Sequence, residues 1–199
     1  MLKIAVCSFL ILVGSIGFAV KIQDSYLAEA RGDYQSALSV MQSLSREDPT
    51  ELFYTMRTAW LEYLAGDYGA ALLNYQKAQR MWDHQDAQIG VINCRLALAE
   101  WDAVLTYCDQ LLAEDTQNTL LLAKAAYAAY MKKSYLVAAE YFARIKRINP
   151  WDMENRGYLV NNLYLGGKLE EAKQEYKNLK KYYPQSKIVD DYREVLDIP

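Results

Sequence analysis

The chain has 199 residues, of which 52% are apolar and 24% are charged, and its formal net charge is −3. This composition is typical of a folded soluble protein and excludes an intrinsically disordered chain. The negative balance argues against nucleic-acid binding, because contact with phosphates needs a basic surface.

The first twenty residues differ from the rest of the chain. Lys3 supplies a positive start, residues 4–20 carry no charge, and Gly17-Phe18-Ala19 places small residues at both cleavage-recognition positions. These features predict a signal peptide over residues 1–19, cut after Ala19. The alternative is an uncleaved anchor, because an uncharged stretch of this length reaches the lower limit of the roughly 17–25 residues that span a bilayer. Either way we expect an exported body, periplasmic or held in the inner membrane and facing the periplasm.

A pattern of about 34 residues recurs through the remaining chain. Its first residue stands at intervals of 34, 33, 34 and 34 residues, at Tyr34, Tyr68, Trp101, Tyr135 and Leu169. Steps of three, four and three residues follow, which place side chains on one face of an α-helix. These side chains are Ala37, Ala71, Val104, Ala138 and Ala172, then Met41, Tyr75, Cys108, Phe142 and Tyr176, then Leu44, Ala78, Leu111, Ile145 and Leu179.

Residues that end or begin helices flank this apolar face. Prolines, which end a helix, follow it in three copies, at Pro49, Pro150 and Pro184. Glycines suited to the left-handed conformation that closes a helix precede it, at Gly32, Gly66 and Gly167. Residues suited to cap the next helix are Asp33, Asp67 and Ser134. Each unit is therefore a helical hairpin, and it must stack on neighbours to bury its apolar face.

The segments GDYQSAL, GDYGAAL, EWDAVL, SYLVAAEYF and GKLEEAKQEY open the second helices of these hairpins. In this pattern the chain resembles tetratricopeptide repeat (TPR) proteins. The resemblance implies an all-α, right-handed α-solenoid of about five hairpins in residues 20–184. Their approximate bounds are 18–51, 52–84, 85–118, 119–152 and 153–185, and residues 186–199 form a C-terminal capping helix.

The two ends of the array differ in sequence. After Pro184, Ser186 is suited to cap a last helix, KIVDDYREVL. Its apolar face holds Ile188, Tyr192, Val195 and Leu196, and charged residues cover the opposite face, as a solubilising cap requires. Repeat one overlaps the export segment. Cleavage there would leave Ile22 and Tyr26 on an uncapped end, which we expect to be available for homodimerisation.

The sequence offers no constellation of residues for catalysis. His84 is the only histidine, no CxxC pair occurs, and no Gly-rich phosphate loop is present. Cys94 and Cys108 fall at helical apolar spacing, which favours two buried thiols over a disulfide. We therefore expect no catalytic residue, no metal and no cofactor.

The resemblance implies a binding groove instead, because the first helices of TPR hairpins line a concave surface that holds peptides or partner helices. Carried over through the repeat, this surface takes Phe53, Met56, Trp60 and Tyr63, then Ile89, Asn93 and Leu96, then Ala123, Tyr127, Tyr130 and Met131, then Asn161 and Tyr164. We expect the rings to bury apolar or aromatic anchors of the partner, and Asn93 and Asn161 to hydrogen-bond its backbone.

Two features of this groove are open from the sequence. In repeats two and three the apolar stripe fits a phase shifted by one residue, which would bury Trp60 and turn Arg57 and Leu61 toward the groove. In the favoured phase, the groove lacks the basic residues with which the best-known TPR clamp holds a terminal carboxylate. We therefore do not expect it to capture a carboxyl terminus.

The expected function is that of a non-catalytic scaffold or adaptor of the bacterial cell envelope, which positions a partner protein. The alternative is a periplasmic holding chaperone or assembly factor that shelters exported chains. An unrecognised enzyme would require carboxylates assembled in a pocket. The expected partner is a protein or peptide, with no nucleic acid, and with membrane contact only through an uncleaved N-terminal segment.

Overall fold

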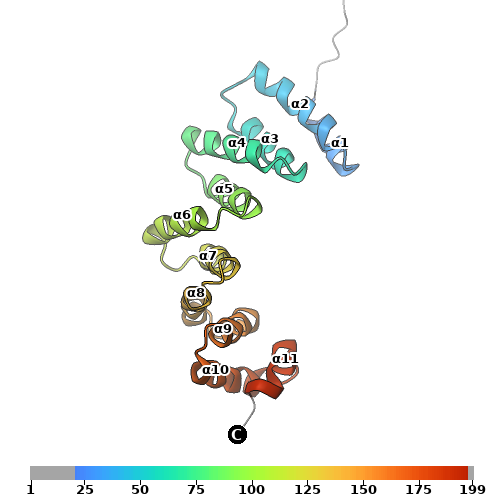
Figure 1. Ribbon diagram of the computed structural model, residues 1–199. Coiled ribbons are helices and arrows are strands. Elements are labelled where there is room, and N and C mark those ends of the chain that lie inside the picture. Colours follow the sequence, from blue (N-terminus) through green and yellow to red (C-terminus); the bar gives the residue numbers. More distant parts are fainter. Residues whose placement is uncertain (1–20, 197–199) are drawn as a thin grey trace, which may run out of the picture.

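The computed structural model describes residues 21–196, in which every regular element is an α-helix. The helices are α1 (Ile22–Ala30), α2 (Tyr34–Glu47), α3 (Leu52–Leu64), α4 (Tyr68–Met81), α5 (Gln85–Ala97), α6 (Trp101–Glu114), α7 (Thr119–Met131), α8 (Tyr135–Ile148), α9 (Met153–Leu165), α10 (Leu169–Tyr182) and α11 (Lys187–Leu196). Successive pairs form five hairpins, and α11 follows the last (Figure 1). The predicted all-α solenoid with a capping helix is confirmed.

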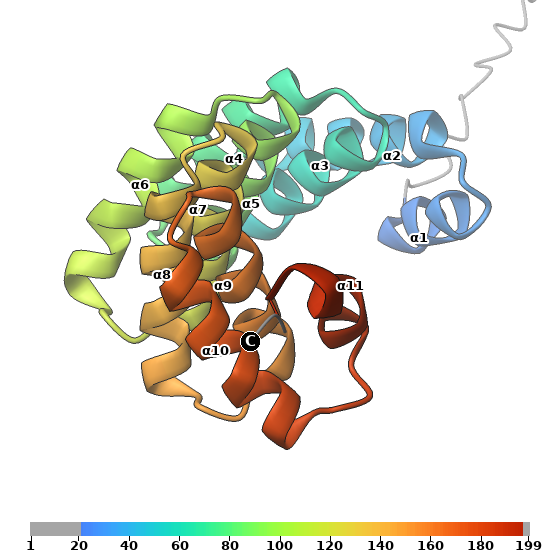
Figure 2. The same cartoon turned by 60° about the horizontal axis from the view of Figure 1, so that its bottom comes forward.

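The hairpins stack in chain order and build a curved array. Each helix packs mainly against its neighbours in the sequence, so α1 and α11 lie at opposite ends (Figure 1). Figure 2 shows α6, α8 and α10 along the outer side of the curve, with α5, α7 and α9 toward the inner side. The first helices of the hairpins therefore present a concave surface.

The predicted register of the second helices sets the core. The five residues at the first step, from Ala37 to Ala172, are all fully buried, because a small side chain there lets the next helix approach closely. All five residues at the second step are buried as well. At the third step Leu111 is only partly buried, and its neighbour Leu112 takes the core position instead.

The turns inside the hairpins have the predicted left-handed backbone. Gly32, Gly66 and Gly167 have φ of 73°, 82° and 77°. In the other two hairpins Ala99 and Lys133 take the same conformation, with φ of 57° and 60°. A side chain with a Cβ is strained in this region, so two of the five turns are less stable than their glycine counterparts.

Replacing Lys133 with glycine is expected to stabilise the protein. The change relieves the left-handed strain, and part of that gain is lost because glycine is more flexible in the unfolded chain. We expect the free energy of unfolding in urea to rise by about 0.5–1 kcal/mol. The matched control is Lys133→Ala, which removes the same charge and keeps the strain; an equal gain in this variant would contradict the explanation.

Two of the predicted helix caps form and two do not. The carboxylates of Asp33 and Asp67 each accept the backbone N–H three residues ahead, at 3.1 Å. Ser134 precedes α8, but its side chain makes no capping hydrogen bond. The buried Ser186 hydroxyl has no hydrogen-bond partner in the described chain. For Ser134 and Ser186 the predicted caps are therefore wrong, and the helices start from backbone contacts alone.

The capping helix α11 buries a slightly different face from the predicted one. Leu196 is buried as expected, and Ile188 and Tyr192 are partly buried. Val195 is exposed, and Val189 takes the core position, where its carbonyl accepts a hydrogen bond from the Tyr176 hydroxyl at 3.1 Å. This hydrogen bond gives the buried Tyr176 hydroxyl an acceptor and joins α10 to α11.

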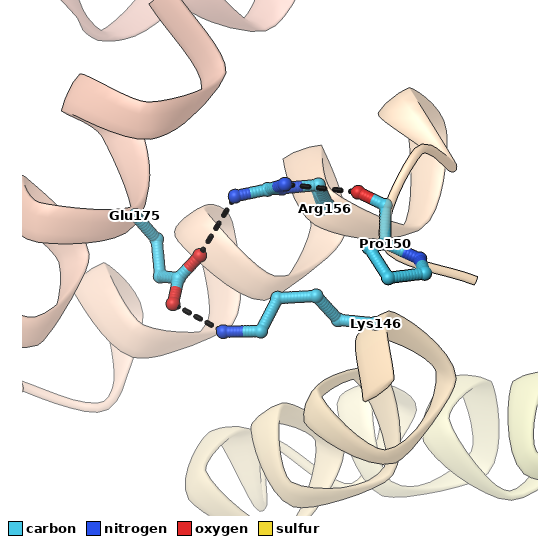
Figure 3. A network of polar contacts seen from close by, with 4 residues as sticks. All are labelled: Lys146, Pro150, Arg156 and Glu175. Atoms are coloured by element: carbon cyan, nitrogen blue, oxygen red, sulfur yellow. Dashed lines mark hydrogen bonds and ion pairs between the residues drawn. The ribbon is translucent and has the colours of Figure 1, made fainter. Parts of the chain in front are cut away.

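A partly buried ionic network ties the last two hairpins together. Glu175 of α10 forms ion pairs with Lys146 of α8 and with Arg156 of α9 (Figure 3). The Arg156 guanidinium also donates to the Pro150 carbonyl at 2.9 Å, in the turn between α8 and α9. Three helices and one turn are therefore held by a single carboxylate.

The remaining predictions concern the export segment, the two cysteines of the repeats and the absence of a metal site. The export segment, residues 1–19, lies outside the described residues. Between residues 21 and 196, no helix combines the length and apolarity that a bilayer span requires.

Cys94 and Cys108 are free and buried, and burial raises the pKa of each thiol to about 12. Within the same range, no three His, Cys, Asp or Glu side chains gather in a way that would hold a metal ion.

Candidate functional site: the concave groove

The N-terminal part of the concave surface contains a large open hollow, the N-terminal hollow, of about 780 Å³. Side chains from α1, α3, α5 and the start of α7 line it, joined by residues of the turn between α4 and α5. Aromatic and apolar members include Tyr26, Phe53, Met56, Trp60, Tyr75, Trp82, Ile89 and Leu120. Phe53 and Trp60 are 46% and 42% exposed, so a ligand there would find large apolar area that is still in contact with water.

Polar contacts hold the aromatic wall of this hollow in place. Arg57 forms an ion pair with Glu29 at 2.6 Å, and its guanidinium lies 3.6 Å from the centre of the Tyr26 ring. The Trp60 indole N–H donates to the same carboxylate at 3.0 Å. Burial alone would raise the pKa of the Glu29 carboxyl, but the hydrogen bonds from Trp60 and Arg57 outweigh it and lower that pKa. The network joins α1 to α3 and fixes the positions of Tyr26 and Trp60.

One ring of the hollow comes from a second helix. Tyr75 belongs to α4, and it reaches the hollow because α5 has a glycine, Gly90, beside it. A Cβ at position 90 would overlap the Tyr75 ring. Because Gly90 has no side chain, the Tyr75 ring of α4 can line the hollow together with the side chains of the first helices.

A second, smaller hollow, the C-terminal hollow, lies between α7 and α9 and has a volume of about 310 Å³. Its lining is mostly aromatic and amide, from Ala123, Tyr127, Tyr130, Phe142, Asn155, Tyr158 and Asn161. Tyr127 is 48% exposed, and its ring meets Trp101 edge-on at 6.3 Å. Residues of α7 line both hollows, so the two adjoin along the concave surface.

A half-buried lysine contacts a residue of the N-terminal hollow. Lys124 of α7 donates from Nζ to the side-chain oxygen of Asn93, which lines the N-terminal hollow, at 2.7 Å. No carboxylate in residues 21–196 forms an ion pair with this ammonium. Burial lowers the pKa of Lys124. The site offers a partly desolvated cation and an amide without a fixed counter-charge.

Comparison with solved structures identifies the architecture. A tetratricopeptide repeat protein from Parabacteroides merdae superposes with a TM-score of 0.73 over 88% of this chain and 70% of that chain, at 19% identity. The chain has the fold of a TPR protein. MamA from Desulfovibrio magneticus RS-1 gives 0.68 at 13% identity, covering 82% of this chain and 93% of that chain. YrrB, described as a TPR protein with an unusual peptide-binding site, gives 0.67 at 12% identity, covering 87% and 90%.

At these identities the likeness establishes the TPR fold alone. No protein-family model matches the sequence, and no curated protein matches it.

The TPR array brings most of the predicted groove residues together. Phe53, Met56, Trp60, Ile89 and Asn93 line the N-terminal hollow, and Ala123, Tyr127, Tyr130 and Asn161 line the C-terminal one. In repeat two the structure combines features of the favoured phase and of the phase shifted by one residue. Trp60 is exposed and Leu61 is fully buried, as in the favoured phase, yet Arg57 lines the hollow as in the shifted one.

Other predicted residues lie beside the hollows without lining them. Tyr63 stacks on Trp60 with ring centres 6.2 Å apart, and Leu96 packs against the core. Met131 is exposed at the end of α7. The Tyr164 ring meets Tyr192 of α11 at 5.2 Å. The Tyr192 hydroxyl also hydrogen-bonds the side-chain oxygen of Asn161, so this amide is already partly engaged, contrary to the expectation that it is free.

Sequence reasoning missed one column of groove residues. The positions that follow Met56, Ile89 and Ala123 are Arg57, Gly90 and Lys124, and the corresponding residues of α9 and α11 are Tyr158 and Tyr192. Gly90 has no side chain, but three members of the column reach back to the preceding repeat: Arg57 to Glu29, Lys124 to Asn93 and Tyr192 to Asn161. The regular 34-residue spacing of these large or charged side chains was the available signal.

Proposed function

We propose that this protein is a non-catalytic scaffold that holds a segment of a partner protein in its concave groove. The observation that carries the proposal is the pair of adjoining hollows, which present exposed rings and amides along the first helices, with Lys124 hydrogen-bonded to Asn93 of the N-terminal hollow. Apolar pockets with a few fixed polar groups are the usual means by which a rigid groove binds an extended or helical peptide. The TPR fold supports the same role by analogy.

A non-catalytic role agrees with the chemistry of the groove. His84, at the rim of the N-terminal hollow, accepts a backbone N–H from Asp86 at 3.2 Å and serves as the helix cap of α5. The two thiols are buried, and their raised pKa keeps them protonated. The hollows are therefore suited to contact and hold a ligand.

The partner segment is expected to carry a carboxylate between its apolar anchors, because Lys124 has donors to spare and no acid beside it. A Lys124→Met variant should bind the partner about tenfold more weakly, which is the usual cost of losing a hydrogen bond from a charged group. Its stability should be unchanged or higher, because the variant no longer buries an unpaired ammonium. A titration at low and high salt checks this: affinity that is unchanged in the variant would refute the carboxylate contact.

The experiment that tests the proposal is photocrosslinking in living cells. A crosslinking amino acid replaces Tyr127 in the groove, and a control replaces Leu73, which is 67% exposed on the second helix α4. We expect position 127 to capture one partner protein that position 73 does not. Equal capture at both positions would refute the groove, and weak capture of many unfolded chains would support a holding chaperone instead.

The location in the cell envelope is a further part of the proposal, and it is supported by the uncharged residues 4–20 that follow Lys3. Intact mass spectrometry of the protein from its native membranes and periplasm tests it. A mass lacking residues 1–19 indicates cleavage and a periplasmic protein. The full mass in the membrane fraction indicates an anchor, and the full mass in the cytosol contradicts export.

A further inference from the structure

The charge of the protein is divided between its two halves. Residues 21–115 carry 7 lysines and arginines against 15 aspartates and glutamates, and residues 116–196 carry 14 against 9. The N-terminal half is therefore strongly negative and the C-terminal half positive. A molecule with this dipole turns its C-terminal half toward any anionic surface.

Within the positive half, two aromatic rings project at the turn that follows α8. Trp151 is 65% exposed and Tyr182, at the end of α10, is 46% exposed, with their rings edge-on at 5.5 Å. Hydrogen bonds hold the backbone of the turn that contains Trp151. The Trp151 carbonyl accepts the Tyr183 hydroxyl at 2.7 Å, and the preceding Pro150 carbonyl accepts Arg156 of the ionic network (Figure 3). Both rings leave apolar area in contact with water.

Cations that form no ion pair in the described part of the chain lie beside the Tyr182 ring and along the two helices that lead to these rings, although Arg144 also donates to the Thr116 carbonyl at 3.3 Å. The Lys181 ammonium lies 5.1 Å from the centre of the Tyr182 ring. Lys177 lies one helical turn before Lys181 on α10. Arg144 and Arg147, near the end of α8, share a hollow of about 400 Å³ with the adjacent Ile148. Within residues 21–196 none of these four cations forms an ion pair.

Acids that lie close to this patch in the sequence have other partners. Asp152 accepts the backbone and side-chain N–H groups of Asn155, and Glu175 forms ion pairs with Lys146 and Arg156. The patch therefore combines amphipathic rings with cations that lack counter-charges. We propose that this patch, defined by Trp151, Tyr182, Arg144, Arg147, Lys177 and Lys181, docks on the surface of an anionic lipid bilayer.

A bilayer fits this patch better than a protein or nucleic acid does. Tryptophan and tyrosine are the residues that settle at the interface between headgroups and acyl chains, and neighbouring lysines and arginines bind anionic headgroups. The patch lies on the second helices α8 and α10 and the turn after α8, and none of its residues lines a groove hollow, so docking leaves the groove open to a partner. The inference is independent of the proposed function.

The test uses the full chain with an environment-sensitive fluorophore in this turn. Asn149, exposed between Ile148 and Trp151, is replaced by cysteine and labelled, with Cys7→Ser as background because Cys94 and Cys108 are buried. Vesicles of phosphatidylcholine with phosphatidylglycerol are compared with vesicles of phosphatidylcholine alone, each with and without a lipid that carries a quencher near the headgroups. Residues 1–20 do not confound the readout, because an anchor there would act in both kinds of vesicle.

We expect a blue shift and quenching of the fluorophore with anionic vesicles only, lost at high salt. Arg147→Glu with Lys181→Glu should weaken the response at least tenfold, since each basic residue contributes substantially near such a surface. The control is Leu73→Ala, which removes an apolar side chain, 67% exposed, from α4 in the acidic half and should leave the vesicle response unchanged.

Three results would overturn the inference. The first is no response to anionic vesicles at low salt, and the second is an equal response to neutral ones. The third is a response without vesicles that grows with protein concentration, which would mean that the acidic half of a second copy occupies the patch.

Discussion

A Glu175→Ala variant is expected to lose about 2–3 kcal/mol of stability, the largest loss that we predict for a polar substitution in this protein. The change leaves Lys146 and Arg156 without their shared carboxylate, and the Arg156 side chain is only 10% exposed. Removing one partner of a buried ion pair costs about 3–5 kcal/mol, because the remaining charge stays desolvated. Partial exposure of Lys146 reduces that cost through screening by solvent. Urea unfolding followed by circular dichroism measures the loss.

Two further variants separate the network from a general effect of charge. Glu175→Gln keeps the shape and an acceptor oxygen, so it should lose less than Glu175→Ala. Glu171→Ala removes a carboxylate from the same helix, and its ion pair with Lys168 is exposed, so we expect a change within about 0.5 kcal/mol. If Glu171→Ala and Glu175→Ala lose the same amount, the network does not stabilise the last two hairpins.

The double variant Phe53→Ala with Tyr127→Ala is expected to bind the partner at least tenfold more weakly. One ring lies in each hollow, and both are about half exposed in the free protein, so a ligand would bury them. Aromatic anchors at the centre of an interface typically contribute more than about 1 kcal/mol each. Tyr164 is a poorer choice than Phe53, because its ring is already packed against Tyr192. Titration with the partner captured at position 127 gives the affinity.

The control for this variant is Leu73→Ala, which removes an exposed apolar side chain from a second helix. It should bind with unchanged affinity. The urea midpoint of the double variant should also stay near that of the native protein, because neither ring is part of the core. Unchanged affinity in the double variant would contradict the placement of the partner in the two hollows.

The stacking of the hairpins could be predicted from the sequence because the repeat fixes which side chains face the next helix. Ala37 and its four equivalents are fully buried, as the pattern of the second helices predicts. These features follow from helical geometry and from the 34-residue period, which together leave one register that buries the apolar face.

Other features depend on contacts between distant residues. Tyr75 lines the groove only because Gly90 of the next hairpin has no side chain there. Lys124 and Tyr192 reach back to Asn93 and Asn161, so the polarity of the groove depends on how long side chains bend. Repeat periodicity gives the direction of a Cα–Cβ bond and does not give the end point of a lysine or a tyrosine.

The turn between α8 and α9 was also predictable only in part. Pro150 correctly marked the end of α8, whose last residue is Ile148. The sequence did not reveal that Arg156 and Tyr183 hold the carbonyls of this turn, which contains the exposed Trp151. Those hydrogen bonds come from α9 and from the end of α10, and only the stacked array brings the three segments together (Figure 1).

Amide hydrogen exchange with and without the captured partner tests the central proposal most directly, because it reports on every helix at once. If the hollows hold a polypeptide segment, the partner should slow exchange in α3, α5, α7 and α9 and leave α4, α6 and α8 unchanged. Protection confined to the second helices, or no protection in either set at saturating partner, would contradict binding in the concave groove.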